Sequence, residues 1–223
     1  AELHEARHGD AGLVRWIETE IACPSTMVDR IVPATTPDDV ARLARACGVH
    51  DAGTVKTEPF RQWVIEDRFA AGRPAWERVG AQLVDDVAPF EAAKLRLLNG
   101  SHSTLAYLGC LAECEYVHEA IALPPYRALV ERLMQEARAT LAPTAGLDLG
   151  GYCTELLARF ANPALRHRCR QIAMDGSQKL PQRLLGTLRD NLAAGRPHEA
   201  AAFGVAAWIR YASGVDERGT PFE

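Results

Sequence analysis

The sequence predicts an all-α protein. Helix-start and helix-end signals recur along most of the chain, whereas alternation of apolar and polar residues never continues long enough for a sheet. The clearest start is Thr36, followed by Pro37 at the first helical position and two aspartates in the first turn, and Gly48 ends that helix. These signals together favour a multi-helical fold.

The remaining helices follow from apolar spacing. Within the helix that ends at Gly48, positions i, i+3, i+4 and i+7 are apolar, which predicts a buried stripe made of Val40, Leu43, Ala44 and Cys47. Similar patterns predict helices at roughly residues 75–85, 89–98, 101–122, 125–142, 151–161, 164–174, 180–194 and 198–212, about nine in all. β-branched and aromatic residues occur together in only short segments, such as residues 62–65.

Composition argues against a nucleic-acid partner, against an anionic-membrane partner and against a membrane-spanning helix. With 25 Lys and Arg against 29 Asp and Glu, the net charge is -4, and no basic cluster is present to neutralise nucleic acid or an anionic membrane. The longest apolar run, residues 200–209, is about half of what a membrane-spanning helix needs. The first residues lack the apolar core of a signal peptide, and the cysteines form no CxxC, so reduced thiols in the cytoplasm are expected.

Two sequence features resemble metal sites, and neither is expected to be one. His4, Glu5 and His8 match H-E-x-x-H, but the match lies at the chain end, and Gly9 and Gly12 follow it instead of a packed helix. Cys110 and Cys114 are one helical turn apart without a second pair, which is typical of small core residues. We therefore expect no metal.

Polar residues in an apolar stretch give a stronger signal. Lys94, Asn99 and His102 lie in KLRLLNGSHSTLAYLG, and a continuous α-helix would place Asn99 about 140° and His102 about 80° around the axis from Lys94. Their heads can converge because side chains lean toward the helix N-terminus. Spacing alone leaves a second interpretation open, and even favours it: a surface lysine, a helix-ending asparagine and a core histidine. A loop over residues 175–179 is a weaker candidate site of the same kind.

Four ordered segments resemble the mannitol dehydrogenase family of polyol-specific long-chain dehydrogenases. They cover residues 24–37, 58–67, 94–109 and 171–183 and read PSTMVDRIVPATTP, EPFRQWVIED, KLRLLNGSHSTLAYLG and QIAMDGSQKLPQR. The last segment is more similar to the uronate-reducing branch of the family, the fructuronate reductases, than to the mannitol-oxidising branch.

The resemblance implies a domain organisation. The family joins an N-terminal Rossmann domain to a C-terminal helical domain that resembles that of 6-phosphogluconate dehydrogenase, and this chain corresponds to the helical part. No G-x-G-x-x-G occurs in the sequence. We therefore expect residues 1–23 to be the tail of a missing Rossmann domain and residues 24–223 to form the substrate-binding domain.

The resemblance also implies roles for residues. Lys94 is expected to be the general acid/base, with Asn99 and His102 holding the reacting oxygen, and no metal is then needed. Asp29 and Lys179 match positions that line the family's substrate pocket. Gln171 stands where polyol-oxidising members carry an arginine, and Arg170 is one place away; both are therefore candidate substrate contacts.

The expected activity is NAD(P)-dependent interconversion of D-fructuronate and D-mannonate. Mannitol and fructose are the alternative substrates, and a helical interaction module without chemistry is the alternative class. NAD or NADP would be bound mainly by the absent domain, and Val28 is the residue of this chain that is expected to contact the cofactor. The chain alone is expected to be inactive and to self-associate through an apolar patch near Val28, Ile31 and the Lys94 helix.

Overall fold

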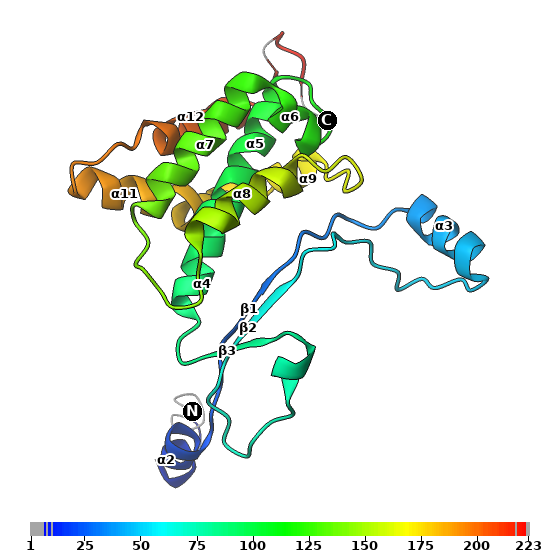
Figure 1. Cartoon of the computed structure of the whole chain (residues 1–223). Coiled ribbons are helices and arrows are strands. Elements are labelled where there is room, and N and C mark those ends of the chain that lie inside the picture. Colours follow the sequence, from blue (N-terminus) through cyan, green and yellow to red (C-terminus); the bar gives the residue numbers. More distant parts are fainter. Residues whose placement is uncertain (1–6, 8, 10, 217, 222–223) are drawn as a thin grey trace. The chain divides into compact units, whose positions relative to one another are not determined.

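The computed structural model describes residues 7, 9, 11–216 and 218–221, and it divides into two compact units (Figure 1). The first unit comprises Ala1–Asp29 and Arg61–Ala88, and the second comprises Arg30–Phe60 and Pro89–Glu223. Each unit has its own architecture and is described by itself.

The first unit is built on a three-stranded sheet in the order β1-β2-β3. Its elements are α2 (Ala11–Glu20), β1 (Thr26–Asp29), β2 (Gln62–Glu66), the 3₁₀ helix η1 (Trp76–Val79) and β3 (Gln82–Val84). β1 runs antiparallel to β2, with Thr26 opposite Ile65, and β3 runs parallel to β2. Val64 in the central strand is fully buried.

This sheet corrects the all-α expectation. The strands have five residues or fewer, which is too short for alternation to be visible. β1 also pairs with a strand far along the chain: the Thr26 hydroxyl donates a hydrogen bond to the Val64 carbonyl, 38 residues away. Residues 62–65 are indeed extended, but the predicted helix at residues 75–85 is wrong. Gly80, at a φ of 96°, ends η1 and lets the chain turn into β3.

The second unit is mostly helical. Its elements are α3 (Pro37–Cys47), α4 (Ala88–Ala93), η2 (Lys94–Asn99), α5 (Gly100–Leu111), α6 (Val117–Ala122), α7 (Pro124–Arg138), α8 (Leu149–Phe160), α9 (Cys169–Ala173), α10 (Gly176–Leu180), η3 (Pro181–Leu185), α11 (Gly186–Ala193) and α12 (Glu199–Tyr211). The predicted helix at 101–122 is divided into α5 and α6 by a turn in which Glu113 has a φ of 60°.

α5 is the centre of this unit, as predicted from its apolar sequence. All of its residues are buried, and α6, α7, α9 and α12 pack around it (Figure 1). Two glycines allow the close approach: a Cβ on Gly109 would lie 2.7 Å from Cys169 Sγ, and one on Gly204 would lie 2.6 Å from Thr104 Oγ1. Packing on all sides explains why α5 carries no polar face.

α3 begins and ends as predicted but buries less than predicted. The Thr36 hydroxyl accepts a hydrogen bond from the Asp39 amide, and Gly48 caps the end at a φ of 70°. No residue of the helix is buried, so the predicted buried stripe is wrong: its first three residues are half-buried and Cys47 is exposed. The physical reason is visible in Figure 1, where α3 lies at the end of an arm of the second unit.

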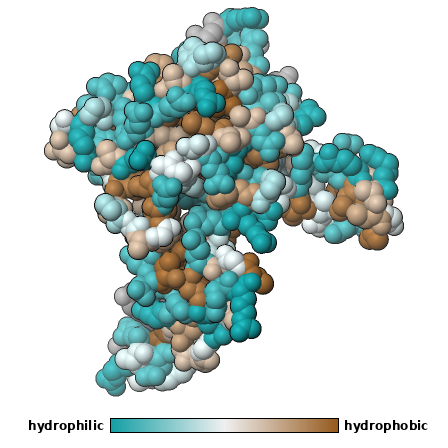
Figure 2. All heavy atoms as spheres, in the orientation of Figure 1, coloured by the Kyte–Doolittle hydropathy of each residue, from teal (hydrophilic) through white to brown (hydrophobic). Residues whose placement is uncertain are grey.

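Two surface features bear on earlier expectations. Val28 and Trp63, opposite one another in the β1–β2 register, are 51% and 40% exposed, whereas Ile31 is buried and is therefore not part of an apolar patch. Hydrophilic side chains predominate on the face shown in Figure 2.

No helix in the described part of the chain is both long and apolar enough to cross a membrane. All six cysteines are free thiols.

Candidate functional site

Lys94 and Asn99 lie at the two ends of a π-helix, η2, which connects α4 to α5 without a break. The Gly100 amide donates to the Leu95 carbonyl, five residues earlier, instead of four. The wider turn brings residues five apart nearer to the same face than an α-helix does. This corrects the angle of about 140° expected between Lys94 and Asn99 from regular α-helical geometry.

His102 lies in the first turn of α5 and is 7% exposed. Its ring stacks on Phe160, with centroids 5.3 Å apart, and contacts His167 edge to face at 4.9 Å. Burial lowers the pKa of His102 well below its usual value, and the positive charges of Arg183, Arg159 and Lys179 act in the same direction. The imidazole is therefore neutral near pH 7, with one nitrogen able to donate and the other to accept.

A buried ion pair supports this region. Arg159 Nη2 lies 2.7 Å from Glu58 Oε1, and Arg159 Nε donates to Glu58 Oε2 at 3.0 Å. The Ile31 amide also donates to Glu58, and the Arg159 guanidinium lies 3.9 Å from the centroid of the Phe60 ring. No sequence pattern predicted this pair. Glu58 lies within one of the four segments that resemble the family, but its partner is 101 residues away, and no local pattern joins them.

Lys179 is held by its own loop. Asp175 adopts a left-handed φ of 56°, and Gly176 after it is buried so closely against Trp208 and Tyr107 that a Cβ would collide with both. Lys179 Nζ donates to the Met174 carbonyl at 2.5 Å and lies 3.7 Å from Asp175 Oδ2. Nζ also lies 3.5 Å from the Ile172 carbonyl, so the structure gives this half-buried ammonium group two carbonyls and one carboxylate as partners.

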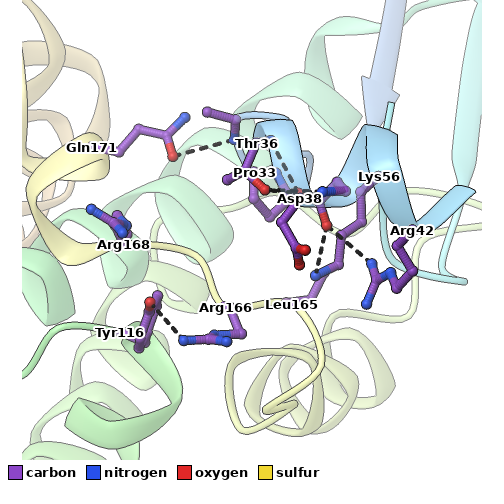
Figure 3. A pocket seen from close by; sticks show the side chains of 12 residues that line it. Pro33, Thr36, Asp38, Arg42, Lys56, Tyr116, Leu165, Arg166, Arg168 and Gln171 are labelled. Atoms are coloured by element: carbon purple, nitrogen blue, oxygen red, sulfur yellow. Dashed lines mark hydrogen bonds and ion pairs between the residues drawn. The ribbon is translucent and has the colours of Figure 1, made fainter. Parts of the chain in front are cut away.

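Gln171 lies at a different cavity, of about 640 Å³, shown in Figure 3. Its Oε1 accepts a hydrogen bond from the Ala34 amide at 3.3 Å, and Arg166 and Arg168 line the same cavity. Gln171 thus connects α9 to the arm that carries α3. Arg170 is exposed and is not among the residues that line this cavity.

Asp29 and Val28 lie on β1, in the first unit. Asp29 is fully buried and pairs in register with Gln62, and Val28 points to the opposite, exposed face. The structure therefore places these two candidates in a different unit from Lys94, Asn99 and His102.

The arrangement in the second unit offers proton transfer and hydrogen bonding. It combines a half-buried lysine, a carboxamide and a neutral imidazole on the contiguous η2–α5 segment, with Lys179 and Arg183 near the imidazole. Arg183 was not singled out from the sequence. His4, Glu5 and His8 lie outside the described residues, and no three His, Cys, Asp or Glu side chains within the described part are grouped to hold a metal ion.

Comparison with known families identifies the chain. The C-terminal domain of mannitol dehydrogenase matches residues 86–223, more than half of the chain, and the Rossmann domain of mannitol dehydrogenase matches residues 3–78. The chain belongs to the mannitol dehydrogenase family. Neither the family match nor the division into two units coincides with the expected boundary after residue 23.

Individual relatives are similar over the whole chain. D-mannonate oxidoreductase of Escherichia coli is 53% identical over 100% of this chain and 46% of its own length, and the uncharacterized oxidoreductase YdfI of the same bacterium is 53% identical over 96% and 44%. The structure of Pseudomonas fluorescens mannitol 2-dehydrogenase with NAD and D-mannitol has a TM-score of 0.88 and 43% identity, over 97% of this chain and 44% of that one. The chain thus spans less than half the length of the relatives it matches.

Proposed function

We propose that this chain contains the substrate domain of an NAD(P)-dependent oxidoreductase that interconverts D-fructuronate and D-mannonate. The observation that carries the proposal is the η2–α5 junction, where a π turn and a buried first α-helical turn present Lys94, Asn99 and His102 on one continuous segment. The 53% identity to D-mannonate oxidoreductase supports the choice of substrate.

In this proposal the three side chains divide the work. Lys94 takes the proton from the substrate hydroxyl during oxidation and returns it during reduction. Asn99 donates its amide N–H to the oxygen, and neutral His102 donates from a ring nitrogen as negative charge develops there. The low pKa of His102 suits this role because the imidazole stays a neutral donor and does not compete for the proton.

Four further contacts belong to the proposal. In the second unit we assign Lys179, Gln171 and Arg170 as substrate contacts, and in the first unit we assign Asp29 the substrate-binding role that the family resemblance implies. Gln171 already bonds to the Ala34 amide, so its contribution is to hold the arm rather than to supply a charge. These roles need no metal, and we place the reaction in the cytoplasm.

The chain offers little to hold the cofactor's pyrophosphate. Nowhere in the sequence does G-x-G-x-x-G occur, and the described strands are not followed by a glycine-rich turn that opens a helix. NAD or NADP would supply the hydride acceptor, and we propose that a dinucleotide-binding domain beyond these residues holds it. Exposed Val28 is the one residue that we assign to the cofactor's surface.

A second candidate is interconversion of mannitol and fructose. It is favoured by the TM-score of 0.88 to the mannitol 2-dehydrogenase complex. The glutamine at position 171, where polyol-oxidising members are expected to carry arginine, favours the uronate instead.

Steady-state kinetics of this chain joined to a complete dinucleotide-binding domain test the proposal. We expect kcat/KM to be highest for D-fructuronate among ketoses and keto-uronates, and we expect Lys94→Ala to lower kcat by about 10²–10⁴-fold. The exposed Arg127→Gln variant serves as the control with unchanged rates. Preference for fructose would favour the second candidate, and absence of turnover with any sugar would favour an interaction module.

A further inference from the structure

Three cationic side chains lie near His102, and their charges are balanced differently. Arg159 is paired with Glu58 at 2.7 Å, and Lys179 lies 3.7 Å from Asp175 while donating to a backbone carbonyl. Arg183 instead donates from Nη1 to the neutral hydroxyl of Ser103 at 3.0 Å. Its charge is therefore not matched by the group that holds it.

The position of Arg183 is fixed by the backbone around it. Arg183 lies in η3, a second π-helix, which packs against η2, and a Cβ on Gly100 would lie only 2.7 Å from the Arg183 carbonyl oxygen. Ser103, its partner, directly follows His102 in α5. Arg183 is thus held beside the segment that carries the proposed catalytic groups.

The guanidinium retains unused hydrogen-bonding capacity. Arg183 Nε is buried and has no hydrogen-bond partner among the described residues. Burial also lowers the pKa of Arg183, since desolvation disfavours its charged form. A half-buried guanidinium whose Nε is buried without a hydrogen-bond partner is costly unless a ligand of opposite charge completes it.

We propose that Arg183 recognises the carboxylate of the sugar-acid substrate and so determines the preference for a uronate over a neutral ketose. This inference rests on the proposed function. A guanidinium matches a carboxylate in charge and in planar, two-point geometry. A neutral ketose carries a hydroxymethyl group at that end, so it leaves the charge of Arg183 unmatched.

Another basic side chain close to this segment, Arg96, is already paired with a carboxylate. Arg96, in η2, lies 2.5 Å from Asp190, and Gln171 brings no charge to the position where polyol-oxidising members are expected to have one. Arg183 is therefore the basic side chain beside His102 whose charge is left for a substrate.

The test uses the complete enzyme and measures selectivity rather than activity alone. We expect Arg183→Gln to lower kcat/KM for D-fructuronate by about 10–100-fold, the loss of one charged hydrogen bond, while kcat/KM for fructose changes less than threefold. Arg183→Lys should restore part of the loss, because it keeps the charge but not the planar fork. Arg196→Gln is the matched control: this half-buried guanidinium also bonds a neutral side chain, Asn191, in the turn between α11 and α12.

A second measurement needs no variant. The wild-type enzyme should prefer D-fructuronate to its uncharged methyl ester by a similar factor, and Arg183→Gln should lose that preference. If the ester is reduced as well as the acid, or if Arg183→Gln lowers both uronate and ketose rates equally, Arg183 has no role in selectivity. A wild-type preference for fructose would instead contradict the proposed function itself.

Discussion

The half-buried imidazole of His167 contacts the buried imidazole of His102, and the two make the stability of the chain depend on pH. Burial lowers the pKa of His167 to about 4, against about 6.5 in an unfolded chain. The unfolded state therefore binds more protons between these values. The contribution of His167 to the free energy of unfolding is complete above about pH 6.5 and is lost as the pH falls toward 4, a change of about 3 kcal/mol.

Urea unfolding of the chain at a series of pH values measures this effect. The slope of stability against pH should be steeper in the wild type than in His167→Phe, which keeps an aromatic ring but cannot titrate. His198→Phe is the control, because His198 is bonded at the edge of α12, away from this cluster. Equal slopes for wild type and His167→Phe would show that His167 is not buried in its neutral form.

The Glu58–Arg159 pair gives a second prediction at the scale of single residues. Arg159→Met leaves the Glu58 carboxylate buried without its cation, so it should lower the free energy of unfolding by about 3–5 kcal/mol. Adding Glu58→Gln to the same chain should recover part of the loss. The exposed pair Arg127–Glu131, opened by Arg127→Met, should cost less than about 1 kcal/mol. A single-variant loss no greater than that of the exposed pair would contradict the buried geometry.

At the scale of elements, two glycines hold equivalent positions in their helices but differ in how much space is left for a side chain. Gly100 and Gly186 each follow a π-helix and begin an α-helix. A Cβ on Gly100 meets the backbone of Arg183 at 2.7 Å, whereas one on Gly186 lies 3.4 Å from the movable end of Arg96. Gly100→Ala should therefore lower stability by about 1–3 kcal/mol, and Gly186→Ala should be neutral or raise it by up to about 1 kcal/mol.

Thermal or chemical unfolding of the two variants decides the point, and far-UV circular dichroism checks that both stay helical. A Gly100→Ala variant as stable as the wild type would mean that the start of α5 and η3 do not approach each other this closely.

The elements that could be predicted from sequence are those whose signals are local. The Thr36 cap and the Gly48 end depend on residues within the same helix, and α5 is apolar on every side. The π turns could not be predicted, because one extra residue per turn leaves no mark in the spacing of apolar side chains. The short strands could not be predicted for a related reason, because their pairing depends on partners far along the chain.

The same distinction applies to the candidate site. The sequence directed attention to Lys94, Asn99 and His102 because polar groups stand out in an apolar stretch. Arg159 and Arg183 did not stand out, since arginines on helices are common, and only the folded chain brings them near His102. The assigned roles of the site residues remain predictions.

At the scale of the whole molecule, we predict that this chain alone does not reduce D-fructuronate with NADH. Hydride transfer needs the nicotinamide within a few ångströms of the substrate carbon, and the described residues lack the phosphate-binding turn that would place it. Adding a separate dinucleotide-binding domain should produce turnover, and repeating the mixture with Lys94→Ala should abolish it. Turnover by the chain alone, or undiminished turnover with Lys94→Ala, would show that the chemistry is assigned to the wrong residues.

The central position of α5 also determines which helix of the second unit is the last to expose its backbone amides to solvent. Because all residues of this helix are buried by the helices around it, its amides can exchange with solvent only when those helices detach. Hydrogen–deuterium exchange should therefore be slowest in α5, whereas α3, which buries none of its residues, should exchange through local opening. His102 would then be carried by the part of the second unit that opens last, whereas α3 would open well before it.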